Sequence, residues 1–532
     1  MSSAGEPRAY PTRGDGSVRP ARRRDRVLQS TRAASSISAL SRSRILLQID
    51  RFGGVGPRST RLAWLHMERL SGLDASFLYS ESPTQPLNVC SILEVDTSTM
   101  PGGYTFDRLR DELATRIAGI PEFRAKLADS QLNLDYPVWV DDDAFDIDRH
   151  LYRISLPLPG GRRELAEICG HIASVPLDRS RPLWEMWVIE GIAEMNPHKG
   201  GILAVMTKVH HAAVDGVTGA SLLSQLCSVE PDAPPPDAVA GPGKAGPLEI
   251  AAGGLMRFAS RPWQFVNVVP TTVATIVKTL RRARGGLTMA APFAAPATRF
   301  NASITIARNV ALAQMDLEDI KKVKNRFNVT VNDVVMALCA AVLRWFLLDH
   351  AELPDRSLVA MVPVSVHDKC DRPGHNQLSG MFCRLETNIG DPGVRLREIA
   401  RDDAAAKNHS AAISPTLLQD WTQLAGRVLL GSVLRLVAST PHIGNPVHNL
   451  IISNVPGPQA KLYFLGCEVE AMYPLGPLFH GCGLNITVMS LSGKLNVGVL
   501  SCPDLVPDLW RLADDFDVAL EQLLECAVPA PL

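Results

Sequence analysis

Apolar and polar positions along the chain follow two different periods, and together they predict a mixture of strands and helices. Runs rich in apolar and β-branched residues are typical of strands, whereas apolar residues three or four positions apart are typical of helices. The predicted strands are residues 88–96, 184–192, 201–209, 310–315 and 359–366. The predicted helices are residues 106–117, 163–174, 317–327 and 332–348, the last apolar on several faces and therefore buried. This alternation favours an α/β or α+β fold.

Two stretches interrupt the pattern. Residues 229–247 are rich in Pro, Ala and Gly, which indicates an extended linker. Residues 1–66 carry thirteen arginines, no lysine and four acidic residues, a net charge of +9, with little hydrophobic periodicity, which favours disorder. We expect this segment to be either a start-site artefact, with translation beginning at Met67, or a basic arm that binds a surface.

A third segment, residues 251–285, changes character along its length. It begins with apolar residues such as Leu255 and Phe258 and ends with Arg281, Arg282 and Arg284. Such a segment can lie on an anionic membrane surface. It can equally be a helical crossover packed on the domains, with its charges in solvent.

Composition bounds the class of protein. A chain of 532 residues with 46% hydrophobic residues is long enough for two domains. Its net charge of −1 argues against a nucleic-acid partner. Ten cysteines without a framework spacing favour a reduced, cytoplasmic setting. No run of 18 apolar residues occurs, so contact with lipid is expected to be peripheral.

The candidate chemistry follows one predicted strand, where residues 210–216 read His-His-Ala-Ala-Val-Asp-Gly. Histidine takes up and returns protons near neutral pH, and a carboxylate such as Asp215, four positions after His211, can orient an imidazole. Gly216 permits a turn that a Cβ would hinder. The segment therefore predicts a general base at a strand end, directed into a cleft.

The residues alone leave other interpretations of the histidine pair open. The pair can belong to an ordinary turn or core, and a metal site is a third option, although no Cys or Glu cluster with ligand spacing lies nearby. The chain has no Gly-x-Ser-x-Gly nucleophile motif, and no cysteine lies in a recognisable catalytic context. A base without a nucleophile favours direct attack by a bound alcohol, amine or thiol on an activated acyl group.

Six motifs in register resemble a known family. His-His-x-x-x-Asp-Gly resembles the signature of the chloramphenicol acetyltransferase-like superfamily and of peptide synthetase condensation domains. The other motifs narrow the resemblance to the bacterial wax ester synthase/acyl-CoA:diacylglycerol acyltransferase family. They are residues 70–78, Pro-Leu-Trp within 181–185, Asn-Asp within 331–335, Ser-Asn-Val-Pro-Gly-Pro within 452–458, and residues 484–487 with 506–510. The resemblance covers about residues 67–528.

The resemblance implies a two-lobe, condensation-domain-like α/β (α+β) sandwich with a central tunnel. We expect an N-terminal acyltransferase lobe and a C-terminal one, joined by a Pro-rich linker with crossover helices. After the basic extension at 1–66, the N-terminal lobe is predicted at 67–228, the linker with its crossover helices at 229–298, and the C-terminal lobe at 299–532.

The resemblance also implies an O-acyltransferase with acyl-CoA as co-substrate and no cofactor or metal. The acceptor would be diacylglycerol, giving triacylglycerol, or a long-chain alcohol, giving a wax ester. His211 is assigned as general base, His210 as its site-shaping neighbour and Asp215 as a structural orienter. Asn332 and Asp333 are candidate substrate contacts, with Asn332 the better candidate for the acyl carbonyl. Asp333 lies near a helix N-terminus, where a structural cap explains it equally well.

Two rival functions differ in class. One is a condensation-type or polyketide-associated acyltransferase acting on carrier-protein thioesters, which the Pro-Leu-Trp and Ser-Asn-Val-Pro-Gly-Pro motifs disfavour. The other is a non-catalytic lipid-binding or droplet-coating protein, which the intact histidine motif disfavours. We expect a cytoplasmic protein associated peripherally with membrane or lipid droplets. His375 departs from the Gly-Gly-Asn-Gln form of some members and is expected to narrow or polarise a local wall.

Overall fold

The computed structural model describes residues 67–193, 201–213, 225–259, 293–365, 378–410 and 445–527. Several expectations lie outside these residues and stay predictions. They concern the basic extension at 1–66, Asp215 and Gly216, the arginines at 281–284 and His375.

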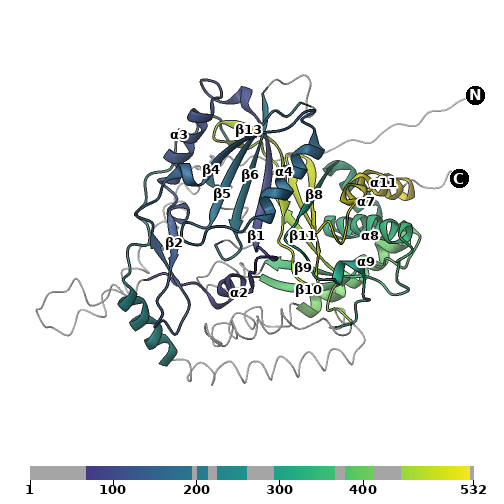
Figure 1. Cartoon of the computed structure of the whole chain (residues 1–532). Helices are drawn as coiled ribbons and strands as arrows, with labels where there is room; N and C mark the ends of the chain where they lie inside the picture. The colour runs from purple at the N-terminus through teal and green to yellow at the C-terminus, as the bar shows by residue number, and fades with distance from the viewer. Residues whose placement is uncertain are drawn as a thin grey trace, which may run out of the picture. The chain divides into compact units, whose positions relative to one another are not determined.

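Seven strands form the first sheet, in the order β4-β5-β6-β1-β13-β12-β7. Figure 1 labels β4, β5, β6, β1 and β13 of this sheet. They are β1 (Asn88–Asp96), β4 (Leu151–Ser155), β5 (Trp184–Glu190), β6 (Ile202–His210), β7 (Cys227–Ser228), β12 (Tyr463–Phe464) and β13 (Cys467–Leu475). Only β4 and β5 pair in parallel; the other neighbours are antiparallel. The strand that carries the histidine pair, β6, lies between β5 and β1.

Six strands form the second sheet, in the order β10-β9-β11-β14-β15-β8. They are β8 (Asn309–Asp316), β9 (Val359–Ser365), β10 (Leu378–Arg384), β11 (Leu450–Pro456), β14 (Leu484–Leu491) and β15 (Lys494–Ser501). Strand β11 pairs in parallel with both β9 and β14. A separate pair, β2 (Ala125–Ala128) and β3 (Val138–Asp141), is antiparallel.

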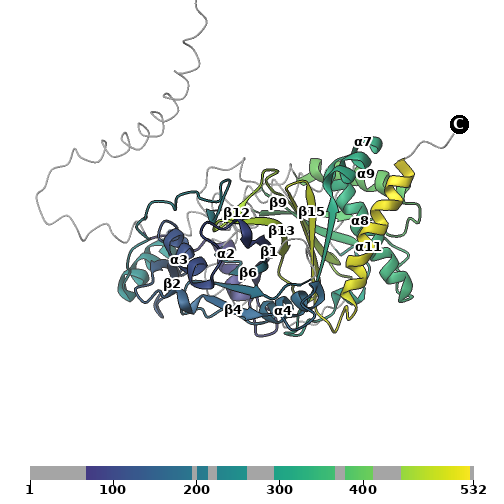
Figure 2. The same cartoon turned by 90° about the horizontal axis from the view of Figure 1, so that it is seen from above.

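Helices accompany both sheets. Among the described residues they include α2 (Gly72–Ser80), α3 (Phe106–Ile117) and α4 (Arg162–Ser174) in the first half and α7 (Leu317–Phe327), α8 (Val331–Asp349), α9 (Pro392–Ser410) and α11 (Leu509–Ala527) in the second. Short 3-10 turns are η2 (Thr97–Thr99), η3 (Pro121–Phe123), η4 (Ile147–Arg149) and η5 (Arg299–Asn301). Figure 2 shows α7, α8, α9 and α11 gathered beside β15.

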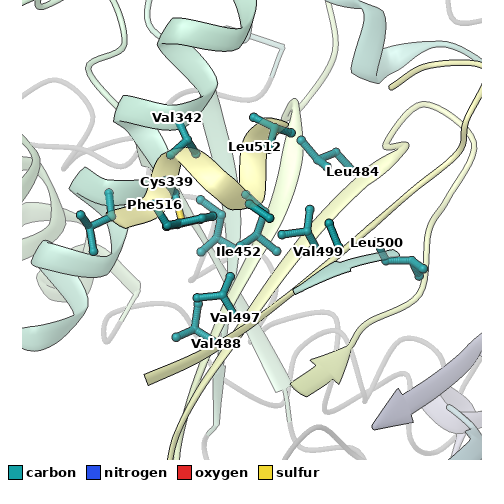
Figure 3. Packing of buried hydrophobic residues seen from close by; sticks show 14 of the residues in the cluster. Cys339, Val342, Ile452, Leu484, Val488, Val497, Val499, Leu500, Leu512 and Phe516 are labelled. Carbon is teal, nitrogen blue, oxygen red and sulfur yellow. The ribbon is translucent and has the colours of Figure 1, made fainter. Parts of the chain in front are cut away.

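The largest apolar core joins the second sheet to its helices. Figure 3 shows side chains of α8 and α11, such as Val342 and Phe516, against Ile452 of β11, Val488 of β14 and Val497 of β15. All five of these side chains are 0–1% exposed. Dense packing of this kind holds β11 and β14 in place, so the residues on their other faces have fixed positions.

Helix α8 passes the length and composition test for a membrane span, but 72% of its apolar window is buried inside the protein. It contacts α7, α9, α11 and β11. Its burial identifies it as a core helix, as predicted for residues 332–348. Thr330 caps its N-terminus: the Thr330 hydroxyl accepts from the Asp333 N–H at 3.2 Å, and the Asp333 carboxylate accepts from the Thr330 N–H at 2.8 Å.

The predicted strands and helices are confirmed, with ends that move by at most a few residues. Residues 229–246 contain no helix or strand, as expected for the linker. The limits of the two lobes stay predictions. The two sheets do not divide at residue 299, however, because β12 and β13 come from the C-terminal part and complete the first sheet.

Candidate active site

Strand β6 delivers the two histidines to the point where three backbone segments meet. The N–H of His210 donates to the Leu183 carbonyl at 3.0 Å, and the N–H of His211 donates to the Leu87 carbonyl at 2.8 Å. A tight turn follows, in which the Ala213 N–H donates to the His210 carbonyl at 2.9 Å. The backbone of the pair is therefore fixed on both sides and at its end.

His210 is fully buried and faces a polar cluster. Its Nδ1 accepts a hydrogen bond from the Ala212 N–H at 3.0 Å, so in the neutral ring the proton lies on Nε2. That nitrogen lies 3.5 Å from Oε2 of Glu81. Both ring nitrogens are thus directed at protein groups, which supports a site-shaping role for this residue.

Glu81 connects the histidine pair to Arg179. Its Oε2 accepts from Nε of Arg179 at 2.9 Å, and its Oε1 accepts from the Leu87 N–H at 3.2 Å. Burial raises the pKa of the Glu81 carboxyl, but the hydrogen bonds and charges of His210 and Arg179 outweigh burial and lower this pKa to about 2. Glu81 is therefore a carboxylate that holds His210 directly and His211 through Leu87.

Sequence reasoning missed Glu81 and Arg179. It assigned the role of orienting carboxylate to Asp215. Asp215 lies outside the described residues, so that role stays a prediction. Glu81 follows the quoted motif at residues 70–78 by three positions, and Arg179 precedes the Pro-Leu-Trp segment by two. An acidic and a basic residue close to two separate motifs were the available signal, but nothing in the spacing pairs them across 98 residues.

His211 has an apolar environment. Its ring stacks on Phe77 of α2, with centroids 3.9 Å apart and an angle of 16° between the planes. The residue is 8% exposed. Burial lowers the pKa of His211 to about 4; a hydrogen bond to its own backbone opposes this shift, and the charge of His210 adds to it. At neutral pH the imidazole is therefore uncharged and able to accept a proton.

His211 lines a cavity of about 440 Å³ between the two sheets, here named the histidine cavity. Its walls come from β1, β6 and β13 of the first sheet and from β9, β10, β11 and β14 of the second. Most wall residues are apolar, among them Val89, Val209, Met361 and Phe382. Because Nδ1 of His211 is buried, Nε2 is the ring nitrogen left for proton exchange with a bound group.

Motifs found by resemblance line the histidine cavity or support a strand beside it. Trp184 of the Pro-Leu-Trp motif packs edge-on against Phe123 and donates from Nε1 to its carbonyl at 2.8 Å, which fixes the strand beside β6. Ser453 and Val455 of the Ser-Asn-Val-Pro-Gly-Pro motif line the cavity. Asn485 and Thr487 of the closing motif also line it, and they are hydrogen-bonded to each other at 2.7 Å.

The structure places Asn332 and Asp333 behind the cavity wall. Neither belongs to the described lining of the histidine cavity. Asn332 donates to the Asp403 carboxylate at 3.2 Å and accepts from Asn454 of β11 at 3.4 Å. The Asp333 carboxylate caps α8 through Thr330. Their assignment as substrate contacts stays a prediction, and the contacts observed are those of residues that support the wall.

In the described part of the chain, few side chains are suited to cysteine or metal chemistry. No group of three or more His, Cys, Asp or Glu side chains there could hold a metal ion. Cys90 lines the histidine cavity, but burial raises the pKa of its thiol to about 12, so it stays protonated at neutral pH. The uncharged His211 is therefore better suited than Cys90 to move a proton in this cavity.

Two sheets that enclose a cavity with a strand-end histidine define the class of protein: the chloramphenicol acetyltransferase-like acyltransferases that the motifs led us to expect. A solved structure supports this class. The wax ester synthase/diacylglycerol acyltransferase from Marinobacter aquaeolei VT8 aligns with a TM-score of 0.63 and 29% identity over 87% of this chain and all of that one. The first condensation domain of the calcium-dependent antibiotic synthetase shares the fold, with a TM-score of 0.52 and 16% identity over 87% of this chain and 97% of that one.

Family models and relatives narrow the class. Residues 70–335 match the wax ester synthase/diacylglycerol acyltransferase catalytic domain, and residues 375–524 match the C-terminal domain of the same family. A protein of Mycobacterium tuberculosis (strain CDC 1551 / Oshkosh), provisionally named a diacylglycerol O-acyltransferase, is 60% identical over 88% of this chain and 92% of its own length. The chain belongs to the wax ester synthase/diacylglycerol acyltransferase family and is an acyltransferase, as the motifs predicted.

Proposed function

We propose that this protein transfers a fatty acyl group from acyl-CoA to diacylglycerol, forming triacylglycerol, and that it can also esterify long-chain alcohols. The observation that carries the proposal is the uncharged, buried His211 on the wall of an apolar cavity between the two sheets. Such a cavity suits a fatty chain, and such a histidine suits proton removal from a hydroxyl group.

The proposed reaction uses His211 as the general base. Nε2 of His211 takes the proton of the acceptor hydroxyl while the oxygen of that hydroxyl attacks the thioester carbonyl carbon. The carbon–sulfur bond then breaks, and the CoA thiolate leaves and takes the proton back from the imidazolium. The new ester and free CoA balance the reaction without a covalent enzyme intermediate. A positioned base of this kind contributes about 10²–10⁴-fold in rate.

Acyl-CoA enters this scheme as co-substrate, and the scheme needs no cofactor. Its acceptor is poorly soluble in water, so we propose a cytoplasmic enzyme that visits a membrane or lipid-droplet surface. Residues 251–259, the part of the segment at 251–285 that the structure describes, support this location. Leu255, Met256 and Phe258 there are 48–57% exposed, which is unusual for three large apolar side chains so close together.

The decisive experiment is an assay of the purified protein with labelled palmitoyl-CoA and either dioleoylglycerol or hexadecanol. Labelled triacylglycerol supports the proposal, and labelled wax ester adds the second acceptor. Transfer from an acyl carrier protein but not from palmitoyl-CoA would support the condensation-type rival instead. Binding of either lipid without any product would identify a non-catalytic lipid-binding protein.

A further inference from the structure

A second cavity adjoins the histidine cavity. It measures about 620 Å³ and shares four wall residues with the histidine cavity: Met361, His448, Ile451 and Phe479. His211 belongs to the described lining of the first cavity and not to that of the second. The two spaces therefore meet at a common wall, and only one of them contains the proposed base.

His448 is the titratable side chain of this common wall, and its backbone is tightly held. Its carbonyl accepts from Nδ2 of Asn301 at 2.9 Å. The next residue, Asn449, donates to the Pro296 carbonyl at 2.6 Å and accepts from the Val359 N–H at 2.9 Å. These bonds fix the chain just before β11, so the imidazole of His448 has a defined place between the two cavities.

Nδ1 of His448 is buried and has no hydrogen-bond partner among the described residues. An aromatic neighbour, Phe382, lies with its ring centroid 5.9 Å away and offers no polar group. Burial lowers the pKa of His448 to about 4, so the ring is uncharged at neutral pH and can present Nδ1 as an N–H donor. A buried polar atom left unpaired is unfavourable, and a bound ligand can supply the missing partner.

The number of fatty chains in the reaction indicates which ligand group accepts the hydrogen bond from Nδ1 of His448. When diacylglycerol meets acyl-CoA at His211, three long chains extend from the reaction centre, whereas a fatty alcohol brings only two. A cavity of 440 Å³ lies near the lower end of the roughly 300–1,000 Å³ that hold a drug-sized ligand, and it cannot take all three chains. A chain that enters the second cavity must pass His448, and the polar group at its head is an ester.

We propose that the second cavity binds one ester-linked chain of the diacylglycerol acceptor and that Nδ1 of His448 donates a hydrogen bond to the carbonyl of that ester. This proposal rests on the proposed function. It makes His448 a specificity residue, because a long-chain alcohol has no ester carbonyl and does not need the second cavity.

The test is a competition assay in which palmitoyl-CoA is offered together with dioleoylglycerol and hexadecanol. His448→Phe keeps an aromatic ring without nitrogen, and His448→Asn returns an amide near the position of Nδ1. Val447→Trp fills the second cavity from a residue outside the described lining of the first. His171→Phe on α4 is the matched control, since His171 is exposed.

We expect His448→Phe to lower the ratio of kcat/KM for dioleoylglycerol to that for hexadecanol about tenfold, the effect of one lost hydrogen bond. His448→Asn should restore the ratio to within about threefold of wild type, Val447→Trp should lower it, and His171→Phe should leave it unchanged. An unchanged ratio in both cavity variants, or a parallel fall of both products, would overturn the inference. A wild-type protein that forms neither product contradicts the proposed function itself.

Discussion

The two sides of the β6 end differ sharply, although each presents a histidine. On one side His210 faces Glu81, itself bonded to Arg179, in a network of charges. On the other side His211 stacks on Phe77 and lines an apolar cavity. Successive residues of an extended chain point in opposite directions, so two neighbours of the same type receive different surroundings. Environment, not residue type, therefore separates the proposed base from its support.

Removal of the imidazole on the cavity side should have the largest effect. We expect His211→Ala to lower kcat/KM for both acceptors about 10²–10⁴-fold, because the general base is lost. Circular dichroism and thermal unfolding should show a folded protein. Near-normal turnover in the folded variant would mean that the cavity side of β6 does not hold the base.

Disruption of the charged side should have a smaller effect of a different kind. We expect Glu81→Ala to reduce kcat about tenfold and to lower the free energy of unfolding by about 2 kcal/mol, since it leaves His210 and Arg179 without their shared partner. Glu81→Gln keeps an oxygen acceptor and should recover part of both losses.

The matched control for Glu81 is Glu318→Ala on α7, which removes an exposed pair with Lys321. It should change the free energy of unfolding by less than about 0.5 kcal/mol and leave kcat unaltered. Equal effects of the two glutamates would show that the charged side of β6 does not position the site.

The pH dependence of kcat/KM tests the protonation state of His211. Because burial lowers its pKa to about 4, activity should rise with pH through about 4 and level off well below neutrality. A histidine in water would place the midpoint at about 6.5. The same lowered pKa weakens the fold as pH falls from about 6.5 towards 4, since only the unfolded chain takes up the proton there. Circular dichroism at each pH separates the two effects, and a midpoint near 6.5 would contradict the apolar environment.

The smallest effect is expected behind the cavity wall. Asp333→Ala removes the carboxylate that caps α8 and should cost about 1 kcal/mol of stability with kcat/KM within about twofold of wild type. Thr330→Ala should behave in the same way because it removes the other half of the cap. A large loss of activity in a stable Asp333 variant would instead support the substrate contact suggested by the resemblance.

Much of the architecture could be predicted because it depends on local pattern. The run at 201–209 is mostly apolar and β-branched, as a strand buried along most of its length requires, and the strand spans Ile202–His210. Leu109, Leu113 and Ile117 recur every four residues and form the buried face of α3. Periodicity of this kind survives folding because each element buries the face that its own residues define.

The site was predicted in part. The motif drew attention to His210 and His211, whose assigned roles stay predictions, but it could not locate Glu81. That carboxylate reaches His210 because α2 ends beside the end of β6, and a contact between positions 81 and 210 leaves no trace in local spacing. Similarly, the Asn-Asp motif predicted a contact with the substrate, whereas the structure shows the Asn332 side chain hydrogen-bonded to Asp403 and Asn454.

The sequence by itself determined the strands and helices, the family and the histidine pair of the candidate site, because these depend on residue type, order and short spacing. Only the tertiary structure decided that His211 is uncharged, that Glu81 and Arg179 hold its neighbour, and that two cavities meet at His448. Burial, pKa and cavity shape arise from residues far apart in the chain that two sheets bring together. No local pattern contains that information.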